Sequence, residues 1–444
     1  MPSTEVIILL LFLVSASGFA LKYLLKFNTG ISNCIYPVSF TILGIIFATQ
    51  LQGISFVEAI TFLGAAIAQF IAFVVVSRSR QRSSFTFHTF ASLASNGSWY
   101  ITLNILDRAN AYWPLFLLHI AGIIAGRTVG VIWSQYIEKK LGLISDATKD
   151  ARLAPGQRLR VFMAEKTFWA LALLLVIYVV YAGFNFSADA NTSIAIVIGL
   201  GILQNFFYAL TTRASQRGNN WYIVITGLAG GLVFYVSVAY LFSKDMTMAL
   251  FIPYTLSTTL GSVTGAFLSM IIEWTLGIKP DEHLKEKTKN KQTKSKTPYI
   301  VVLGMASIWI IFQGPILKYF GYTQTTIVSP LPFFGEDTLP RMIIMLIASV
   351  IFLFDSAIHT LVSRAGNRNH AGYHVSACIP KGLFDFYKLR YISLNAHIPD
   401  IVPVAIIASC MGSLYGKDIS ERIEKWLQAR MDVEENTKAS AVKA

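Results

Sequence analysis

Apolar runs of about twenty residues recur along the whole chain and constrain its fold more than any other feature, because each could cross the roughly 30 Å hydrocarbon layer of a membrane as a helix. The composition agrees with this interpretation. Of the 444 residues, 54% are hydrophobic and 14% are charged, and the mean hydropathy is +0.55. Soluble domains carry about 25% charged residues. The sequence therefore predicts a polytopic membrane protein.

A short arginine motif follows an apolar run at three places. It reads SRSRQR at 77–82, TRASQR at 212–217 and SRAGNR at 363–368. Aligned without gaps on the first arginine, the three segments share eight identical columns over 69 residues. The columns hold two arginines, two glycines four residues apart, an Ile-Glu pair, a leucine and an aspartate. Because internal repeats dictate architecture, we expect three copies of one unit.

Each copy is expected to contribute four membrane helices, and an apolar run near 5–25 adds a thirteenth span. The lysines of this first run follow its apolar core, which is the reverse of a cleaved signal peptide, so we expect it to be retained. The predicted fold is all-α, a transmembrane bundle of three parallel four-helix repeats in a pseudo-threefold arrangement. The twelve repeated spans are 34–50, 55–76, 85–106, 112–137, 164–185, 192–211, 220–242, 248–273, 299–320, 340–361, 371–392 and 399–416.

The same spans predict the division of the chain and its orientation. With four spans per copy, the arginine motifs and the basic segments 138–160 and 279–296 fall on one side of the membrane. Cytoplasmic loops carry excess Lys and Arg, so this side is expected to be cytoplasmic, with the N-terminus outside the plasma (inner) membrane. The predicted units are an N-terminal span (1–30), membrane repeats at 31–150, 151–285 and 298–430, a basic linker (286–297) and a charged tail (431–444).

The repeated glycines and glutamates predict contacts between helices. Glycines four residues apart allow close helix approach in membranes, so they are expected to pack the third helix against the fourth, or one copy against another. The glutamates are expected at the inner membrane surface, where each either contacts an arginine of the motif in its own copy or snorkels independently. These residues are Gly126, Gly130, Gly261, Gly265, Gly412 and Gly416, with Glu138, Glu273 and Glu424.

Two interpretations of the motif arginines are open from the sequence. They could anchor or pack helix ends at the cytoplasmic surface. Alternatively, the first arginine of each motif could face a common axis and form a cationic mouth for anions such as phosphate or carboxylate. The arginines of this possible ring are Arg78, Arg213 and Arg364, followed by Arg82, Arg217 and Arg368.

Polar residues at one equivalent mid-helix position are candidates for a solute path, because polar groups are costly inside a membrane. They are Gln69, Gln204 and Asp355. Asp355 shares a helical face with His359, which indicates an intrahelical pair or a proton relay. The third copy also has a polar third span, 370–392, which must be shielded by protein, face water or be partly re-entrant.

The segment GIIAGRTVGVIWSQYIEKKLGL (122–143) resembles the glycine-spaced last helix of the YebE-like bacterial membrane proteins. The similarity covers roughly the last three helices of each copy and implies a membrane unit of this kind, but no activity, because that family has none established. This chain departs from the family at the position after the second arginine, where Ser83 and Asn369 replace glycine. The residues that carry the resemblance are Arg213, Arg217, Gly218, Gly261, Gly265, Ile272 and Glu273, with Ile137, Glu138, Ile423 and Glu424.

The sequence contains no GxSxG, HExxH or Walker motif, and Cys34, Cys378 and Cys410 lack metal-ligand spacing. We therefore expect no enzymatic activity, cofactor, metal or nucleic-acid partner. The expected function is a transporter or channel for a small anionic solute. The alternative is a non-transporting scaffold that recruits partners or anionic lipids through its basic loops. A membrane enzyme, supported by the polar third span of the third copy, is a third interpretation.

Overall fold

The structure is a computed structural model that describes Ile45 and residues 55–80, 84–108, 112–143, 155–217, 219–244, 246–278, 297–305, 307–308, 341–367, 371–394 and 401–443. Twelve helices and no strand occur in this part of the chain, which confirms the all-α class. The predicted spans 5–25 and 34–50, apart from Ile45, lie outside the described residues, as do most of 299–320 and the basic linker.

The described helices follow the predicted spans closely. All but one of the predicted boundaries that can be compared differ from the observed ones by six residues at most. The short helix α6 falls in a segment predicted only as a basic loop. The helices are α3 (Phe56–Ser79), α4 (Phe85–Arg108), α5 (Tyr112–Lys140), α6 (Pro155–Met163), α7 (Lys166–Asn185), α8 (Ala188–Ala214), α9 (Asn220–Ser243), η3 (Met248–Leu250), α10 (Phe251–Thr275), α12 (Arg341–Asn367), α13 (Ala371–Leu394) and α14 (Ile401–Lys443).

Local side-chain chemistry explains where several helices begin. Ser55 and Glu58 form a capping box at the start of α3, in which each side chain accepts a hydrogen bond from the backbone N–H of the other residue. Ser187 caps α8 and Asn219 caps α9 in the simpler one-bond manner. These caps fix the points at which the loops between neighbouring helices end.

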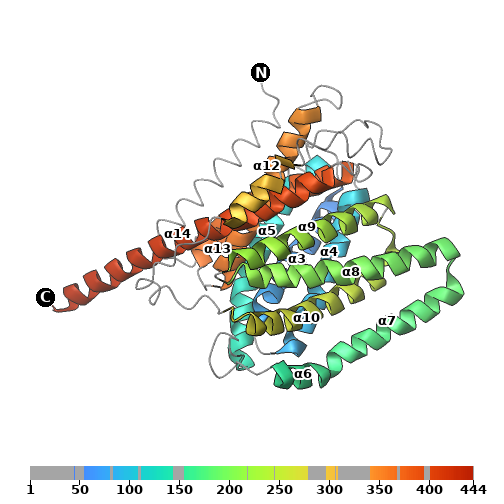
Figure 1. The fold of residues 1–444 in the computed structure, drawn as a ribbon, viewed down its shortest axis with the longest axis horizontal. Helices are drawn as coiled ribbons and strands as arrows, with labels where there is room; N and C mark the ends of the chain where they lie inside the picture. Colours follow the sequence, from blue (N-terminus) through green and yellow to red (C-terminus); the bar gives the residue numbers. More distant parts are fainter. Residues whose placement is uncertain are drawn as a thin grey trace.

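The one large boundary error, at the end of α14, has a clear cause. Helices α5 and α10 end two residues before Gly142 and Gly277, whose φ angles of 62° and 63° are accessible to glycine without strain. The equivalent position of the third copy is Gln428, and there the helix continues to Lys443 instead of ending near residue 416. Figure 1 shows α14 extending well beyond the other helices. The tail predicted at 431–444 is thus helical through Lys443.

The same helix contacts recur in the three predicted copies. The second helix packs against both the third and the fourth: α3 against α4 and α5, α8 against α9 and α10, and α12 against α13 and α14. Contacts between copies join a third helix to a fourth helix: α4 to α10, α9 to α14, and α13 to α5. Each copy therefore contacts both of the others, and Figure 1 shows the helices gathered into one bundle.

The repeated glycines pack the second helix against the fourth, which corrects the prediction that they join the third and fourth helices or neighbouring copies. A Cβ atom on Gly126, Gly261 or Gly412 would lie less than 3.0 Å from a carbonyl oxygen of the second helix in the same copy. Gly130, Gly265 and Gly416 make similarly close contacts one turn later. The carbonyls nearest the first three glycines belong to Ile67, Ile202 and Leu353, which occupy one equivalent position.

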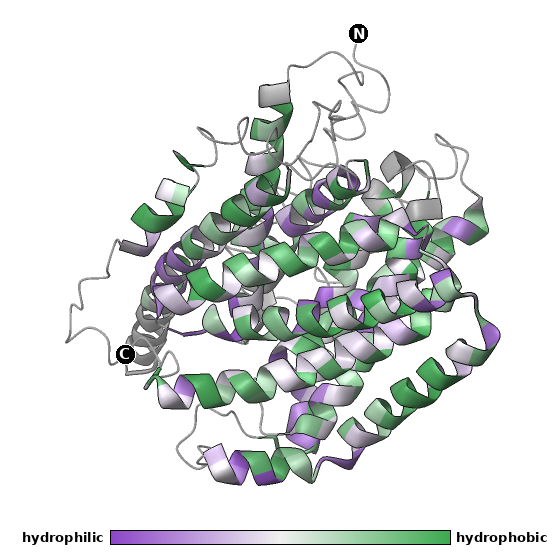
Figure 2. Cartoon of the chain, turned by 45° about the vertical axis from the view of Figure 1, so that its right-hand side comes forward, coloured by the Kyte–Doolittle hydropathy of each residue, from purple (hydrophilic) through white to green (hydrophobic). Residues whose placement is uncertain are grey.

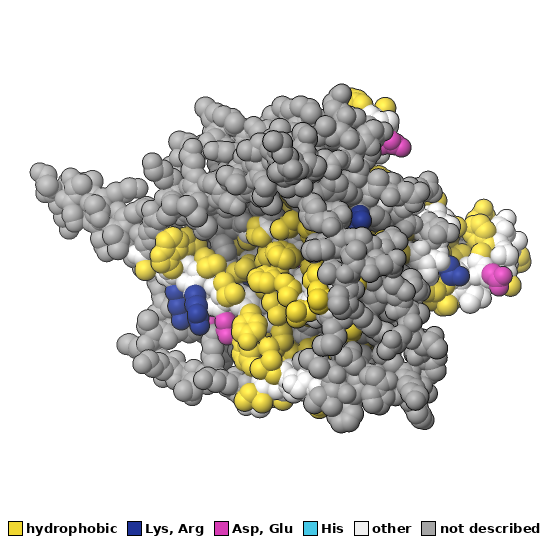
Figure 3. Space-filling view, turned by 90° about the horizontal axis from the view of Figure 1, so that it is seen from above, with side chains coloured by type: hydrophobic (Ala, Val, Ile, Leu, Met, Phe, Trp, Pro, Cys, Tyr) yellow, Lys and Arg dark blue, Asp and Glu magenta, His cyan; other side chains and the backbone are white. Residues whose placement is uncertain are grey.

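Seven described helices are long and apolar enough to cross a membrane, namely α3, α5, α7, α8, α9, η3–α10 and α12. Helix α7 is the most exposed of them, with 17% of its apolar window buried, and Figure 2 shows it as a largely hydrophobic helix at the edge of the bundle. In Figure 3 hydrophobic side chains form a patch near the middle of the face shown. These are the features of a membrane-embedded helical protein. Helices α4, α13 and α14 are too polar to meet the same criterion.

Candidate functional site

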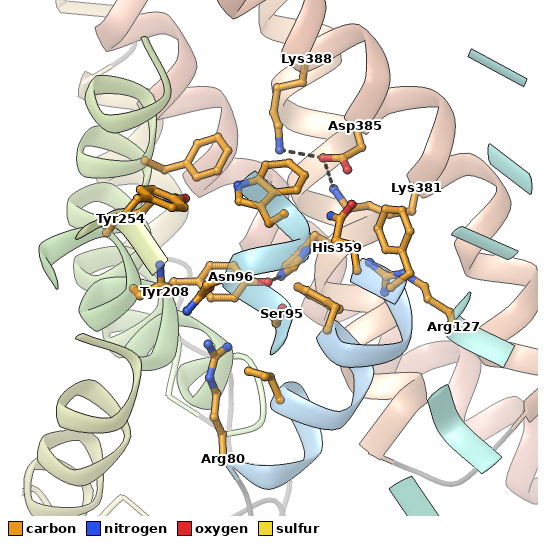
Figure 4. A pocket seen from close by; sticks show the side chains of 18 residues that line it. Arg80, Ser95, Asn96, Arg127, Tyr208, Tyr254, His359, Lys381, Asp385 and Lys388 are labelled. Carbon is orange, nitrogen blue, oxygen red and sulfur yellow. Dashed lines mark hydrogen bonds and ion pairs between the residues drawn. The ribbon is translucent and has the colours of Figure 1, made fainter. Parts of the chain in front are cut away.

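A cavity of about 110 Å³ lies between the three copies (Figure 4). This is roughly the liquid volume of three to four water molecules. Eight helices contribute to its wall, so the cavity forms only when all three copies are assembled. The lining residues are Gln69, Phe70, Phe73, Val76, Arg80, Ser95, Asn96, Trp99, Arg127, Gln204, Asn205, Tyr208, Phe234, Tyr254, His359, Lys381, Asp385 and Lys388.

The cavity is elongated, and its charged lining residues come from two of the three copies. It follows α3 from Gln69 to Arg80, a length of roughly 16 Å at 1.5 Å per residue. Rings and amide groups occupy the wall together with charged groups that come from two copies. Arg80 and Arg127 belong to the first copy, whereas Lys381, Asp385 and Lys388 belong to the third.

Three ring side chains at one equivalent position of α3, α8 and α12 meet at the cavity. The Phe73 ring centroid lies 6.1 Å from that of Tyr208 and 5.7 Å from that of His359. The Tyr208 and His359 centroids are 5.5 Å apart, and the Tyr208 hydroxyl lies 3.0 Å from His359 Nε2. We call these residues the ring trio. Because the three second helices meet through them, they narrow the space between the copies.

Two buried arginines flank the ring trio. The Arg80 guanidinium lies over the Tyr208 ring, 4.7 Å from its centroid, and donates hydrogen bonds to Thr212 at 3.0 Å and Ser262 at 2.9 Å. The Arg127 guanidinium lies over the Phe73 ring at 4.6 Å. Cation–π contacts of this kind stabilise a desolvated arginine by about 2 kcal/mol and leave its charge uncompensated.

Neither of these arginines is ion-paired with a carboxylate in the part of the chain that the structure describes. Both are about 1–2% exposed. Nε of Arg80, and Nε and Nη1 of Arg127, have no hydrogen-bond partner among the described residues. Burial lowers the pKa of Arg80 to about 10, which still leaves the group charged at neutral pH. The cavity wall therefore carries two uncompensated positive charges.

Two lysines and two aspartates form a charge cluster on α12 and α13. Lys381 Nζ contacts Asp355 Oδ1 and lies 3.0 Å from Asp385 Oδ1. Lys388 Nζ lies 2.6 Å from Asp355 Oδ2 and 3.2 Å from Asp385 Oδ1. Each lysine thus bridges both carboxylates, and the cluster is neutral overall. Asp355 does not pair with His359, so the predicted intrahelical pair is wrong, because the lysines of α13 offer full opposite charges.

Several neutral polar atoms at the cavity are also buried without a partner. Among the residues described, the Oε1 atoms of Gln69 and Gln204 and the hydroxyl of Tyr254 make no hydrogen bond. Buried polar groups are usually hydrogen-bonded, because each unmade bond costs about 1–3 kcal/mol. These groups are concentrated at one cavity, beside two arginines that have no carboxylate partner among the described residues.

Hydrogen bonds connect Arg80 on the cavity wall to α10 and α4. Arg80 donates to Ser262, whose hydroxyl lies 3.2 Å from Nε2 of His88. Nδ1 of the same histidine lies 2.7 Å from the hydroxyl of Ser79. These residues line the contact between α4 and α10, which also includes a hydrogen bond from Asn96 to Thr259. These hydrogen bonds link the end of α3 to α4 and α10 beside the cavity.

The predicted solute-path residues have different outcomes. Gln69, Gln204 and His359 line the cavity, whereas Asp355 lies behind the lining and reaches it through Lys381 and Lys388. Helix α13 runs unbroken through Pro380, and its buried Lys381 and Asp385 are shielded by protein, one of the alternatives that the sequence left open.

The first arginines of the three motifs are not a ring around the cavity. Arg78, Arg213 and Arg364 each form a two-bond ion pair with the glutamate sixty residues later, at 2.7–3.0 Å. This confirms the predicted Arg–Glu contact with Glu138, Glu273 and Glu424. Because the arginines are buried and neutralised, they pack helix ends and cannot act as an open cationic mouth. Arg217 also binds Glu273, whereas Arg82 and Arg368 lie outside the described residues.

Sequence reasoning missed Arg80 and Arg127 as cavity residues. Arg80 lies within the first motif, but Ser215 and Gly366 occupy its equivalent positions. Arg127 follows the first repeated glycine, where the other copies have Ser262 and Ser413. A search for charged residues that occur in one copy only, instead of residues shared by all three copies, could have found both arginines.

No protein-family model, no curated protein and no solved structure matches this chain. The resemblance to the YebE-like proteins therefore stays a prediction.

Proposed function

We propose that this chain is a multi-pass transporter that carries a small anionic solute through the cavity between its three copies. The observation that carries the proposal is the pair Arg80 and Arg127, two buried guanidinium groups on the cavity wall without a carboxylate partner in the described part of the chain. Leaving a buried charge uncompensated costs several kcal/mol. A bound anion would remove this cost and satisfy their open N–H groups.

The unpartnered neutral groups narrow the chemistry of the solute. Gln69 and Gln204 line the cavity, and their amide oxygens, which can accept hydrogen bonds, have no partner among the described residues. The solute we propose therefore combines a negative group with O–H or N–H donors. The small volume favours a solute of a few heavy atoms.

A pseudo-threefold bundle of thirteen spans is the architecture we propose for this transporter. It is supported by the recurrence of the Arg–Glu pairs, of the glycine contacts and of the ring trio at equivalent positions. The closed series of contacts between third and fourth helices supports it as well. We place the arginine motifs and the C-terminus on the cytoplasmic side of the plasma membrane because of the charge bias of the loops.

A carrier fits the cavity better than an open channel. The ring trio stands between the amides of Gln69 and Gln204 and the guanidinium of Arg80 along the helices. Solute passage would require these rings to separate, so we expect transport to involve movement of the copies relative to one another. The scaffold alternative depends on the basic loop 279–296, which lies outside the described residues, and no observation on the described part favours it.

The test is flux through proteoliposomes that contain the purified full chain. Sulfate, inorganic phosphate and succinate serve as probes because they differ in shape and cross bare bilayers slowly. We expect at least one to be taken up and to raise the unfolding temperature, since binding to the native state stabilises it. Arg80→Gln and Arg127→Gln should lose both effects, whereas Arg80→Lys should retain part of them.

Arg160→Gln is the matched control, because Arg160 is exposed on α6, away from the cavity. It should behave as the wild type. If none of the three anions is transported or stabilises well-folded protein, the proposal is wrong. Equal loss of flux in Arg160→Gln and Arg80→Gln would also count against it, because the effect would then come from net charge.

A further inference from the structure

The charge cluster of Asp355, Lys381, Asp385 and Lys388 is not required by the fold. The positions equivalent to Lys381 are Ser95 and Gly230, and those equivalent to Asp385 are Trp99 and Phe234. Two copies therefore build the same helix contacts with uncharged residues. A charge at the centre of a membrane costs about 2.5–3.5 kcal/mol on the insertion scale, so four such residues in one copy indicate a function.

The two carboxylates of the cluster differ in their access to the cavity. Asp355 and Asp385 contact the same two lysines, but Asp385 lines the cavity and Asp355 does not. The other carboxylate oxygen of Asp385, Oδ2, faces His119 Nε2 on α5 at 3.7 Å. Asp385 is thus the carboxylate that an entering solute would meet first.

An anion in the cavity and an ionised Asp385 compete for the same cations. Lys381 and Lys388 both line the cavity, so a bound anion can take their N–H donors from Asp385. Two negative groups that share one site repel each other, which raises the pKa of the weaker acid and favours its protonation. The carboxylate that loses its lysines would therefore bind a proton from the aqueous phase.

We infer that Asp385 couples the anion to a proton, so that the chain moves one proton with each anion. This inference rests on the proposed function. Anion binding releases Lys381 and Lys388 from Asp385, and a proton from water forms an O–H bond on the freed carboxylate. When the anion leaves on the opposite side, the lysines bind Asp385 again and the O–H bond breaks. The proton is then released on that same side.

The surroundings of Asp385 support this exchange. Helix α12 contributes Asp355 and His359, and α5 contributes His119 and Arg127. Tyr208 of α8 and the ring of Phe234 on α9 complete the neighbourhood, with Lys381 and Lys388 on α13 itself. Around Asp385 the cationic side chains of Lys381, Lys388 and Arg127 outnumber the carboxylates of Asp355 and Asp385. A bound anion would cancel part of this excess positive charge. The Asp385 carboxylate would then be less stabilised as an anion and would accept a proton.

The test measures protons and anions together in weakly buffered proteoliposomes. Radiolabelled sulfate, phosphate or succinate reports the anion, and an entrapped pH-sensitive dye reports the proton, with the membrane potential clamped by potassium and valinomycin. Sulfate is the cleanest probe, because it is the anion of a strong acid and carries no proton across the bilayer by itself. We expect a ratio of one proton per sulfate, and we expect an acidic outside to drive sulfate accumulation.

Asp385→Asn and Asp355→Asn form a matched pair, since each removes one carboxylate from the same two lysines. We expect the proton-to-anion ratio to fall to zero in Asp385→Asn and to keep the wild-type value in Asp355→Asn, whatever their rates. Asp385→Glu, which retains the carboxylate, should keep the ratio.

Failure of this inference is distinct from failure of the proposed function. Anion flux in the wild type without proton movement would overturn the coupling and leave anion transport standing. An equal loss of the ratio in Asp355→Asn and Asp385→Asn would overturn the assignment to Asp385. Absence of flux for all three anions would overturn the proposed function itself. If Asp385→Asn does not fold, the ratio measured for the wild type still decides whether coupling exists.

Discussion

The Tyr208 hydroxyl lies 3.0 Å from Nε2 of His359, and this contact joins equivalent positions on the second helices of two copies. Phe73 occupies the same position in the remaining copy and contacts both rings. Along the helices, a single layer of three side chains thus stands between the amides of Gln69 and Gln204 and the guanidinium of Arg80. In the proposed transporter, the ring trio is therefore the barrier to free passage of solute.

Phe73→Ala should therefore open a leak. Truncation removes the ring that contacts both Tyr208 and His359, and a gap between the two polar regions follows. We expect sulfate efflux from loaded proteoliposomes to continue without a driving pH gradient, unlike in the wild type. Phe207→Ala is the control, since Phe207 neighbours Tyr208 on α8 but does not line the cavity. If proteoliposomes with Phe73→Ala show no more sulfate efflux than those with the wild type, the barrier lies elsewhere.

Close packing at the repeated glycines leads to a prediction about stability. A Cβ atom on Gly261 would collide with the backbone of Ile202, so Gly261→Ala should destabilise the chain by about 1–3 kcal/mol. Gly199 on α8 has no atom within 4 Å of its Cβ position. Gly199→Ala should be neutral or stabilise by up to about 1 kcal/mol, because alanine favours helix. Thermal unfolding in detergent micelles, followed by tryptophan fluorescence, distinguishes the two results.

The buried Arg–Glu pairs predict a different pattern. Glu138→Gln removes the carboxylate that Arg78 binds through two hydrogen bonds, and we expect a loss of about 3–5 kcal/mol. Replacing both partners, in Arg78→Leu with Glu138→Leu, removes the buried charge along with the pair. The double variant should therefore unfold at a higher temperature than Glu138→Gln alone. If the double variant is the less stable one, the pair contributes more than charge compensation.

The sequence predicted the features that recur and missed those that do not. A contact between Glu138 and the first arginine motif could be predicted because the same spacing recurs in the other two copies, but the sequence left open which arginine makes the contact. The glycine spacing likewise identified a packing face. It could not identify the partner helix, because the third helix, the second helix and another copy all satisfy the same spacing.

The sequence predicted part of the cavity lining, namely Gln69, Gln204 and His359, but not its charges. These charges, Arg80 and Lys381 among them, occupy positions that are neutral in the other copies, so a search for residues that are identical in the copies passes over them. They face one another across helices separated by more than two hundred residues of chain. Only the assembled bundle shows that Asp355 prefers the lysines of α13 to His359.

Substitutions at two glutamines can distinguish an effect on anion binding from an effect on stability. Gln69 Oε1 and Gln216 Nε2 are both buried without a hydrogen-bond partner among the described residues, but Gln69 alone of the two lines the cavity. Replacing either with methionine removes an unsatisfied polar group, so both variants should be at least as stable as the wild type in thermal unfolding. Gln69→Met should weaken anion binding about tenfold, the equivalent of about 1.4 kcal/mol, because the solute loses its acceptor. Gln216→Met should bind as the wild type does, and equal affinities in the two variants would remove Gln69 from the site.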